Sequence, residues 1–246
     1  MRHASVPPAK MSAVRPFAFA IALCLGALAV AGCGEDETAE EPRLRGAAPG
    51  KTTQTVVAAL GDSITAGSPA WDPDPGARRP IGEAVDPESQ YGYWAQLRLR
   101  DTRFRNCGVP GERTDEIARR LQRCAKGADV LLIQGGINDI AQMREVASAA
   151  GDLRAMVRRG KSLGLRVALV EVLPWNNGYP AAATAIRRLN RLIGRIGREE
   201  NAPVLPWYRR LEDPRAPGRM KREWTADGDH PSVKGYRRLA EVVTLP

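Results

Sequence analysis

A serine and, far from it in the sequence, a histidine preceded by an aspartate have the types and local settings that nucleophilic catalysis needs. Ser63 follows the apolar run 56–60 and begins the segment Ser-Ile-Thr-Ala-Gly, which indicates a turn from a strand into a helix. His230, one of two histidines in the chain, stands three residues after Asp227 in the segment Asp-Gly-Asp-His-Pro. A serine hydroxyl attacks an acyl carbon when an imidazole takes its proton and a carboxylate holds the imidazole tautomer. These residues therefore predict a nucleophilic hydrolase.

Apolar runs of strand length alternate with helical patterns from residue 55 onward. This alternation predicts right-handed βαβ units and a three-layer α/β/α sandwich around a parallel sheet of about five strands. Catalytic groups in such folds lie beyond the carboxyl ends of the strands, where Ser63 is expected. Thr114 is expected to cap the second helix. The expected strands are 55–60, 103–107, 129–134, 166–172 and 202–206, and the expected helices are 91–100, 114–124, 146–163, 182–200 and 232–243.

Four short blocks resemble those of the SGNH (GDSL-type) hydrolase family, in the same order and over nearly all of residues 55–245. They are Gly-Asp-Ser-Ile at 61–64, Asn-Cys-Gly-Val-Pro-Gly-Glu-Arg-Thr at 106–114, Gln-Gly-Gly-Ile-Asn-Asp at 134–139, and Asp-Gly-Asp-His-Pro at 227–231. The first block has isoleucine where many members have leucine. The resemblance implies a flavodoxin-like strand order 2-1-3-4-5. It also implies hydrolysis of carboxylic esters through an acyl-serine, with no metal and no organic cofactor.

The resemblance assigns a role to each member of the catalytic triad. Ser63 is expected to be the nucleophile, His230 the general base, and Asp227 the carboxylate that orients the imidazole. Asp229, next to the histidine, is the weaker candidate for that carboxylate. Asp62 is expected to hold the turn rather than to take part in the reaction.

The resemblance also implies three donors to the oxyanion of the tetrahedral intermediate. These are the backbone N–H groups of Ser63 and Gly111 and the side-chain amide of Asn138. A glycine lets the backbone approach the developing charge closely, and Gly108 is the alternative to Gly111 for this role. Asp139 is expected to be a structural hydrogen-bond acceptor.

Residues 1–32 are predicted to be a lipoprotein signal peptide. A basic start precedes the apolar stretch 17–30, which is short for a membrane span. Val-Ala-Gly-Cys at 30–33 resembles a bacterial lipobox, which implies cleavage before Cys33 and lipidation of its thiol. The protein is then exported and anchored to the bacterial cell membrane or envelope. An ordinary signal peptide followed by a chance cysteine is the alternative.

The exported chain is expected to consist of a tether and one domain. Residues 33–54 are acidic at first and then rich in Pro and Gly, so they indicate a flexible tether. Residues 55–246 are assigned to the hydrolase domain, and they are long enough to bury one sizeable core. Within them, Ser68–Gln90 is a long Pro-rich insertion, expected either to wall a substrate pocket through Trp71 and Tyr91 or to be a solvated decoration.

The four cysteines have different expected fates. Cys24 leaves with the signal and Cys33 carries the lipid, so Cys107 and Cys124 remain in an oxidising compartment. We predict that they form a disulfide, and two buried free thiols are the alternative.

The composition excludes several classes of function. One histidine remains after export, which excludes a His-rich metal site, and too few cysteines remain for an all-cysteine zinc site. No segment resembles a nucleic-acid-binding module. Loss of the three basic residues of the signal lowers the formal net charge from +9 to +6, which suits an anionic surface or substrate, or a solvated basic face.

The sequence therefore predicts a serine esterase that acts on lipid or small acyl esters. The expected partners are a small-molecule, lipid or glycan ester and, through the lipid anchor, a membrane. The alternatives are a deacetylase of cell-envelope glycans, an acyltransferase, and an envelope-binding lipoprotein without catalysis. Trp175, after the fourth strand, is expected either to pack or to stack on the substrate.

Overall fold

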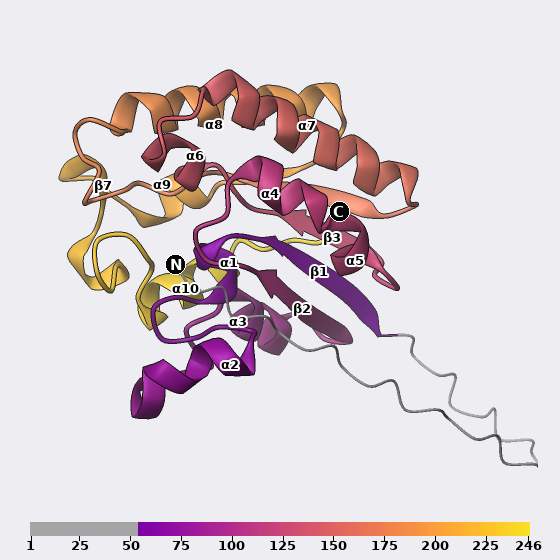
Figure 1. Ribbon diagram of the computed structural model, residues 1–246, viewed down its shortest axis with the longest axis horizontal. Helices are drawn as coiled ribbons and strands as arrows, with labels where there is room; N and C mark the ends of the chain where they lie inside the picture. The colour runs from indigo at the N-terminus through magenta and orange to yellow at the C-terminus, as the bar shows by residue number, and fades with distance from the viewer. Residues whose placement is uncertain (1–53) are drawn as a thin grey trace, which may run out of the picture. The chain divides into compact units, whose positions relative to one another are not determined.

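A five-stranded parallel sheet forms the centre of the fold, and the computed structural model describes residues 54–246 (Figure 1). The order across the sheet is β2-β1-β3-β4-β5, and every adjacent pair is parallel. The predicted sheet and its strand order are both confirmed. The strands are β1 (Thr55–Gly61), β2 (Thr102–Gly108), β3 (Val130–Ile133), β4 (Arg166–Val170) and β5 (Val204–Leu205).

Successive side chains along a strand enter two different hydrophobic clusters, one on each face of the sheet. In β3, Leu131 and Ile133 belong to one cluster, whereas Val130 and Leu132 belong to the other. Figure 1 shows α7 and α8 on one side of the sheet and α3 on the other, which confirms the three layers. The first cluster includes residues of α4 (Thr114–Arg119), α5 (Leu121–Ala125), α7 (Val146–Ser162) and α8 (Ala183–Glu199), and the second includes residues of α3 (Tyr91–Arg98), α9 (Trp207–Leu211) and α10 (Val233–Ala240).

The helix expected at 114–124 differs from the prediction in two ways. It is two helices, α4 and α5, because the backbone leaves the helical conformation at Arg120 (φ −102°, ψ 1°). Thr114 does not cap it, because the helix already begins at this residue. The N–H and the hydroxyl of Thr114 both donate to the buried carboxylate of Asp139, each at 2.9 Å. Asp139 therefore places its negative charge at the positive end of α4.

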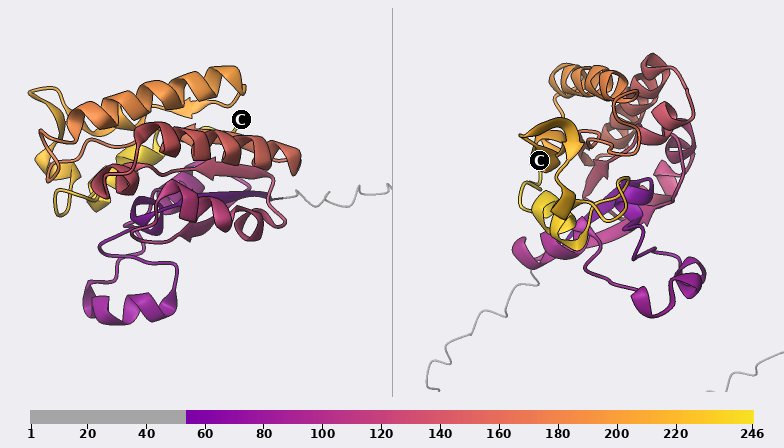
Figure 2. Two further views of the ribbon diagram at one scale, coloured as in Figure 1. Left: turned by 45° about the horizontal axis from the view of Figure 1, so that its top comes forward. Right: turned by 90° about the vertical axis from the view of Figure 1, so that its left-hand side faces the viewer.

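The insertion Ser68–Gln90 has more structure than a plain loop. It contains α2 (Pro75–Arg78) and the 3-10 helix η1 (Arg79–Ala84), and Figure 2 shows it projecting from the sheet. Tyr91 belongs to α3, is 1% exposed and packs edge-on against Trp207, with ring centroids 4.7 Å apart. It also lines a small pocket beside β2, together with Gln90 at the end of the insertion. The role of Tyr91 at a substrate pocket stays a prediction.

The segment between β5 and α10 contains short elements that the sequence does not predict. After α9 come the antiparallel strands β6 (Glu212–Asp213) and β7 (Ala216–Met220), and then the 3-10 helix η2 (Arg222–Trp224). Neither strand shows the periodicity of a strand, since β6 has two residues and β7 contains a proline and a glycine. These elements carry the chain from the edge of the sheet back to the fourth block.

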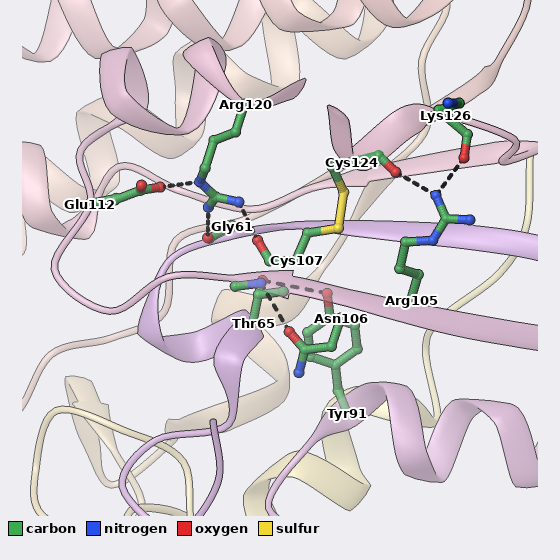
Figure 3. The surroundings of a disulfide bond; sticks show 11 residues. Gly61, Thr65, Tyr91, Arg105, Asn106, Cys107, Glu112, Arg120, Cys124 and Lys126 are labelled. Atoms are coloured by element: carbon green, nitrogen blue, oxygen red, sulfur yellow. Dashed lines mark hydrogen bonds and ion pairs between the residues drawn. A yellow bond between two sulfur atoms is a disulfide. The ribbon is translucent and has the colours of Figure 1, made fainter. Parts of the chain in front are cut away.

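Cys107 and Cys124 form a disulfide, as predicted, with their Cα atoms 6.1 Å apart (Figure 3). Cys107 is the last residue but one of β2, and Cys124 lies in α5. The bond therefore ties the edge strand of the sheet to the helix beside it, at the point where the second block leaves the strand.

Removing this disulfide is expected to destabilise the protein measurably. Cys107→Ala combined with Cys124→Ala should lower the free energy of unfolding by about 3 kcal/mol, because a cross-link over a separation of 17 residues restricts the unfolded chain. Urea unfolding of the double variant, the oxidised wild type and the reduced wild type measures the effect. A double variant as stable as the oxidised wild type would contradict the expectation.

The predicted signal peptide, the predicted lipidation site Cys33 and residues 33–53 of the predicted tether lie outside the described residues. Within residues 54–246, no helix combines the length and the apolar character needed to cross a membrane.

Candidate active site

Ser63 is the first residue of a one-turn helix that directly follows β1. This helix, α1 (Ser63–Ala66), ends at Gly67, whose φ of +108° is readily adopted only by glycine. The side chain of Asp62 accepts a hydrogen bond from the N–H of Ile64 at 2.9 Å and so caps the helix. The strand, the cap and the helix together fix Ser63 at the carboxyl end of the sheet, as predicted for the nucleophile.

His230 and Asp227 meet Ser63 in a continuous chain of hydrogen bonds. Nε2 of His230 lies 3.0 Å from Oγ of Ser63, and Nδ1 lies 2.7 Å from Oδ2 of Asp227. The serine and the histidine are 167 positions apart in the sequence. This geometry lets the imidazole take the serine proton while the carboxylate holds the opposite ring nitrogen.

Asp227 is held as an ionised carboxylate. Its partial burial alone would raise the pKa, but hydrogen bonds from the ring and backbone of His230 and from the backbone of Asp229 outweigh this, so the pKa of Asp227 lies below its usual value. Oδ1 accepts the backbone N–H of Asp229 at 2.9 Å and that of His230 at 2.7 Å. The carboxylate therefore orders its own turn and faces the imidazole as an anion.

Asp229, the weaker candidate for the orienting carboxylate, has a different task. Its Oδ1 accepts hydrogen bonds from Nε1 of Trp175 at 2.5 Å and from Nδ2 of Asn177 at 2.8 Å. Asn177 also donates to the carbonyl of Asp227 at 3.0 Å. Trp175 and Asn177 thus anchor the histidine turn to the loop after β4. Trp175 is also partly buried against the first hydrophobic cluster, which supports a packing role, and its stacking on a substrate stays a prediction.

Gln134 holds the nucleophile turn to the neighbouring strand, a role that the sequence analysis missed. Its Oε1 accepts the backbone N–H of Asp62 at 3.1 Å and the hydroxyl of Thr65 at 2.9 Å, and its Nε2 donates to Oδ2 of Asp62 at 2.9 Å. Gln134 is 5% exposed and directly follows the apolar strand β3. A polar side chain buried at the end of such a strand was the signal that could have identified it.

Asp62 is fully buried, and burial raises its pKa from 3.8 to about 6, although hydrogen bonds from Ile64 and Gln134 and the charge of His230 oppose this. Because the folded-state pKa exceeds the unfolded one, the native state holds this proton more tightly. Ionised Asp62 therefore destabilises the fold. This loss of stability is absent well below pH 3.8, grows between pH 3.8 and about pH 6, and reaches its full size above about pH 6.

Asp62→Asn is expected to remove this pH dependence. The stability of the wild type relative to the variant should fall by about 2 kcal/mol between pH 4 and pH 7, since one pKa unit corresponds to about 1.4 kcal/mol. Urea unfolding of both proteins at several pH values gives the difference in their free energies of unfolding. The effects of other titrating groups are the same in both proteins and cancel in this difference. A difference that stays constant with pH would contradict the expectation.

The backbone conformation and hydrogen bonding distinguish the two glycines considered for the oxyanion hole. Gly108 already donates its N–H to Oδ1 of Asn106 at 2.9 Å, and a Cβ there would lie 2.0 Å from the backbone nitrogen of Ala66. Gly108 therefore serves the packing of β2 against α1. Gly111 has φ +81° and its N–H makes no hydrogen bond within residues 54–246. This arrangement favours Gly111 as the donor.

Asn138, a member of the third block, lies in the short helix α6 (Ile137–Ala141). One of its amide hydrogens is directed to the backbone carbonyl of Glu112, at an N–O distance of 2.9 Å. An amide nitrogen carries two hydrogens, so this contact orients the group and leaves a second donor.

Asp115, Asp139 and Asp152 form the one group of carboxylates within residues 54–246 whose spacing could hold a metal ion. Arg144 pairs with Asp139 at 2.6 Å and with Asp152 at 2.8 Å, and Thr114 also donates to Asp139. The guanidinium supplies the positive charge there, so the cluster is explained as a structural ion-pair network.

Comparisons with known proteins agree with this arrangement. The GDSL-like lipase/acylhydrolase family model matches residues 59–238, which contain all four blocks. A lipase/acylhydrolase from Enterococcus faecalis is similar in structure, with 26% identity, a TM-score of 0.60, and coverage of 77% of this chain and 92% of that one.

Two further solved structures show the same fold. A GDSL-like lipase from Bacteroides thetaiotaomicron VPI-5482 has 20% identity and a TM-score of 0.59, with coverage of 80% of this chain and 88% of that one. A member of the lipolytic protein G-D-S-L family from Veillonella parvula DSM 2008 has 18% identity and a TM-score of 0.59, with coverage of 76% and 94%. No curated protein matches the chain. From the extent of the family match, this chain belongs to the GDSL-like lipase/acylhydrolase family.

Proposed function

We propose that this protein is a serine esterase that hydrolyses carboxylic esters through an acyl-Ser63 intermediate. The observation that carries the proposal is the unbroken hydrogen-bond chain from Asp227 through His230 to Ser63. Membership of a family of lipases and acylhydrolases supports the same reaction class. The chain needs no metal for this chemistry, because the imidazole moves the proton and backbone and amide groups stabilise the charge.

Acylation begins when Oγ of Ser63 attacks the carbonyl carbon of the ester and Nε2 of His230 takes the hydroxyl proton. The carbonyl oxygen becomes negatively charged and accepts hydrogen bonds from the N–H groups of Ser63 and Gly111 and from the amide of Asn138. The bond between the carbonyl carbon and the alcohol oxygen then breaks. The alcohol leaves with the proton from Nε2, and the acyl group stays on the serine.

Deacylation repeats these steps with water. His230 takes a proton from the water as its oxygen attacks the acyl carbon, and the same donors stabilise the second oxyanion. Oγ of Ser63 then leaves and recovers its proton, which releases the carboxylic acid. Throughout, the anionic Asp227 stabilises the imidazolium without taking its proton.

A panel of p-nitrophenyl esters tests the proposal. We expect the purified protein to release nitrophenol from esters of short or long acyl chains, and we expect a fluorophosphonate to abolish the release. Peracetylated sugars in the same panel measure the deacetylase alternative, and added alcohols measure acyl transfer. A folded protein that acts on none of these esters, with or without an alcohol acceptor, would contradict the proposal.

We also propose that the protein acts outside the cytoplasm, anchored by a lipid on Cys33. The support is the basic and apolar leader of residues 1–32 and the lipobox-like Val-Ala-Gly-Cys at 30–33. Expression of the full chain in a bacterium, followed by membrane fractionation of the wild type and of Cys33→Ala, tests this. Membrane association that survives the substitution would contradict lipidation at this site.

A further inference from the structure

The three proposed oxyanion donors come from three separate segments of the chain. The N–H of Ser63 follows β1, the N–H of Gly111 lies in the loop after β2, and the amide of Asn138 belongs to α6. The donors can stabilise one oxygen atom only if these segments keep fixed distances from one another. A displacement of about 1 Å can lower turnover by about 100-fold.

Packing alone does not fix the loop that carries Gly111. Residues 108–110 border a cavity of about 500 Å³, and residues of the insertion between Asp72 and Ala77 form its opposite wall. Val109 is 38% exposed. Because the loop borders this open space, which Arg120 also lines, its position depends on polar contacts as well as on packing.

Two of these contacts are the hydrogen bond from the N–H of Val109 to the carbonyl of Gly61, at 3.0 Å, and the one from Nε2 of Gln142 to the carbonyl of Gly111, at 3.2 Å. Arg120 supplies three more from the break between α4 and α5. Its Nη1 donates to the carbonyl of Cys107 at 2.6 Å, and its Nη2 donates to the carbonyl of Gly61 at 2.7 Å. Its Nε donates to the side chain of Glu112 at 2.6 Å, and the Arg120 side chain is 13% exposed (Figure 3). One guanidinium thus joins the end of β1, the end of β2 and the loop.

The same contacts reach the third donor through Glu112. The side chain of Glu112 is held by Arg120, and its backbone carbonyl accepts the amide of Asn138 at 2.9 Å. Gly61 lies two residues before Ser63, and Glu112 lies one residue after Gly111. Arg120 is therefore linked to all three donor segments, although it is not a member of the catalytic triad.

We propose that Arg120 is a positioning residue that sets the distances among the three oxyanion donors. The planar guanidinium suits this task, because its donors have a fixed fork geometry. The inference rests on the proposed esterase function, and it adds a requirement that the four sequence blocks do not contain.

Arg120→Met tests the inference, with Arg105→Met as the matched control. Arg105 also lies beside the disulfide and the cavity, and its guanidinium donates to the carbonyls of Cys124 at 2.8 Å and Lys126 at 2.6 Å. It therefore ties β2 to the end of α5 but contacts no donor segment. Both variants lose a partly buried guanidinium bound to backbone carbonyls.

The readouts are kcat and KM for p-nitrophenyl acetate and the inhibition constant of an alkyl trifluoromethyl ketone. The serine oxygen adds to the carbonyl carbon of the ketone, and the carbonyl oxygen becomes an oxyanion. The affinity for the ketone therefore reports how well the three donors stabilise that charge. For Arg120→Met we expect kcat to fall about 10- to 100-fold with little change in KM, and the inhibition constant to rise by a similar factor. For Arg105→Met we expect all three quantities to stay within about threefold, even where its stability falls.

Equal kcat and equal ketone affinity in the two variants would overturn the inference, as would a loss confined to KM. If Arg120→Met does not fold, Arg120→Lys and Glu112→Gln are judged by the same readouts. The lysine keeps the charge without the fork, so it should recover kcat only in part. An inert wild type would count against the proposed function, whereas an active wild type with indistinguishable variants would count against Arg120 alone.

Discussion

Ser63→Ala and His230→Ala are each expected to lower kcat by about 10⁶-fold on any ester that the wild type hydrolyses. Loss of Oγ removes the nucleophile, and loss of the imidazole leaves the hydroxyl without a proton acceptor. Both variants should fold like the wild type, because neither side chain belongs to a hydrophobic cluster of the core. The double variant should be no slower than either single variant, since the two residues act as one unit.

Initial rates with p-nitrophenyl acetate, corrected for spontaneous hydrolysis, measure this expectation. Thermal unfolding of each variant shows whether a lost rate reflects chemistry or loss of the fold. A folded Ser63→Ala variant that keeps a tenth of the wild-type rate would show that the hydrolysis occurs elsewhere.

Asp227→Asn is expected to lower kcat by about 10⁴-fold. An amide in place of the carboxylate no longer accepts the Nδ1 hydrogen as an anion, so the imidazole can adopt the tautomer that cannot take the serine proton. The turn should survive, because the amide oxygen can still accept the backbone N–H groups that Oδ1 of Asp227 accepts.

Asp229→Asn is the matched control for this prediction. Asp229 lies two residues away, is also an aspartate, and uses one oxygen to accept hydrogen bonds from Trp175 and Asn177. An asparagine keeps such an oxygen, so kcat should fall by less than about tenfold. Equal losses in the two variants would mean that the structure assigns the orienting carboxylate wrongly.

The layers of the fold could be predicted from the sequence because its strands are buried on both faces. The continuous apolar run from Val130 to Ile133 indicates such a strand, and the structure places its side chains in two clusters. Shorter elements could not be predicted in this way. The β6–β7 hairpin is too short for a strand period and contains a proline and a glycine. Arg120, at the break between α4 and α5, binds the distant carbonyls of Gly61 and Cys107, and local periodicity carries no sign of those contacts.

The triad could be predicted because each member stands in a distinctive block, and the structure brings all three together. The choice between Gly108 and Gly111 required the backbone geometry, since only the structure shows that the N–H of Gly108 already donates a hydrogen bond to Asn106. Gln134 and Arg120 could not be assigned from the sequence. Their hydrogen-bond partners are backbone and side-chain atoms of other segments of the chain, and a pattern of residue types does not reveal them.

Labelling with a fluorophosphonate followed by peptide mapping tests the central claim most directly, because it identifies the nucleophile itself. If Ser63 attacks esters, the active protein should acquire one phosphonyl group, on the peptide that contains Ser63, and activity should fall in proportion to labelling. The His230→Ala variant should react far more slowly, since the Ser63 hydroxyl then lacks its general base. Full inactivation with the label on another residue, or hydrolysis that persists after Ser63 is fully labelled, would contradict the account.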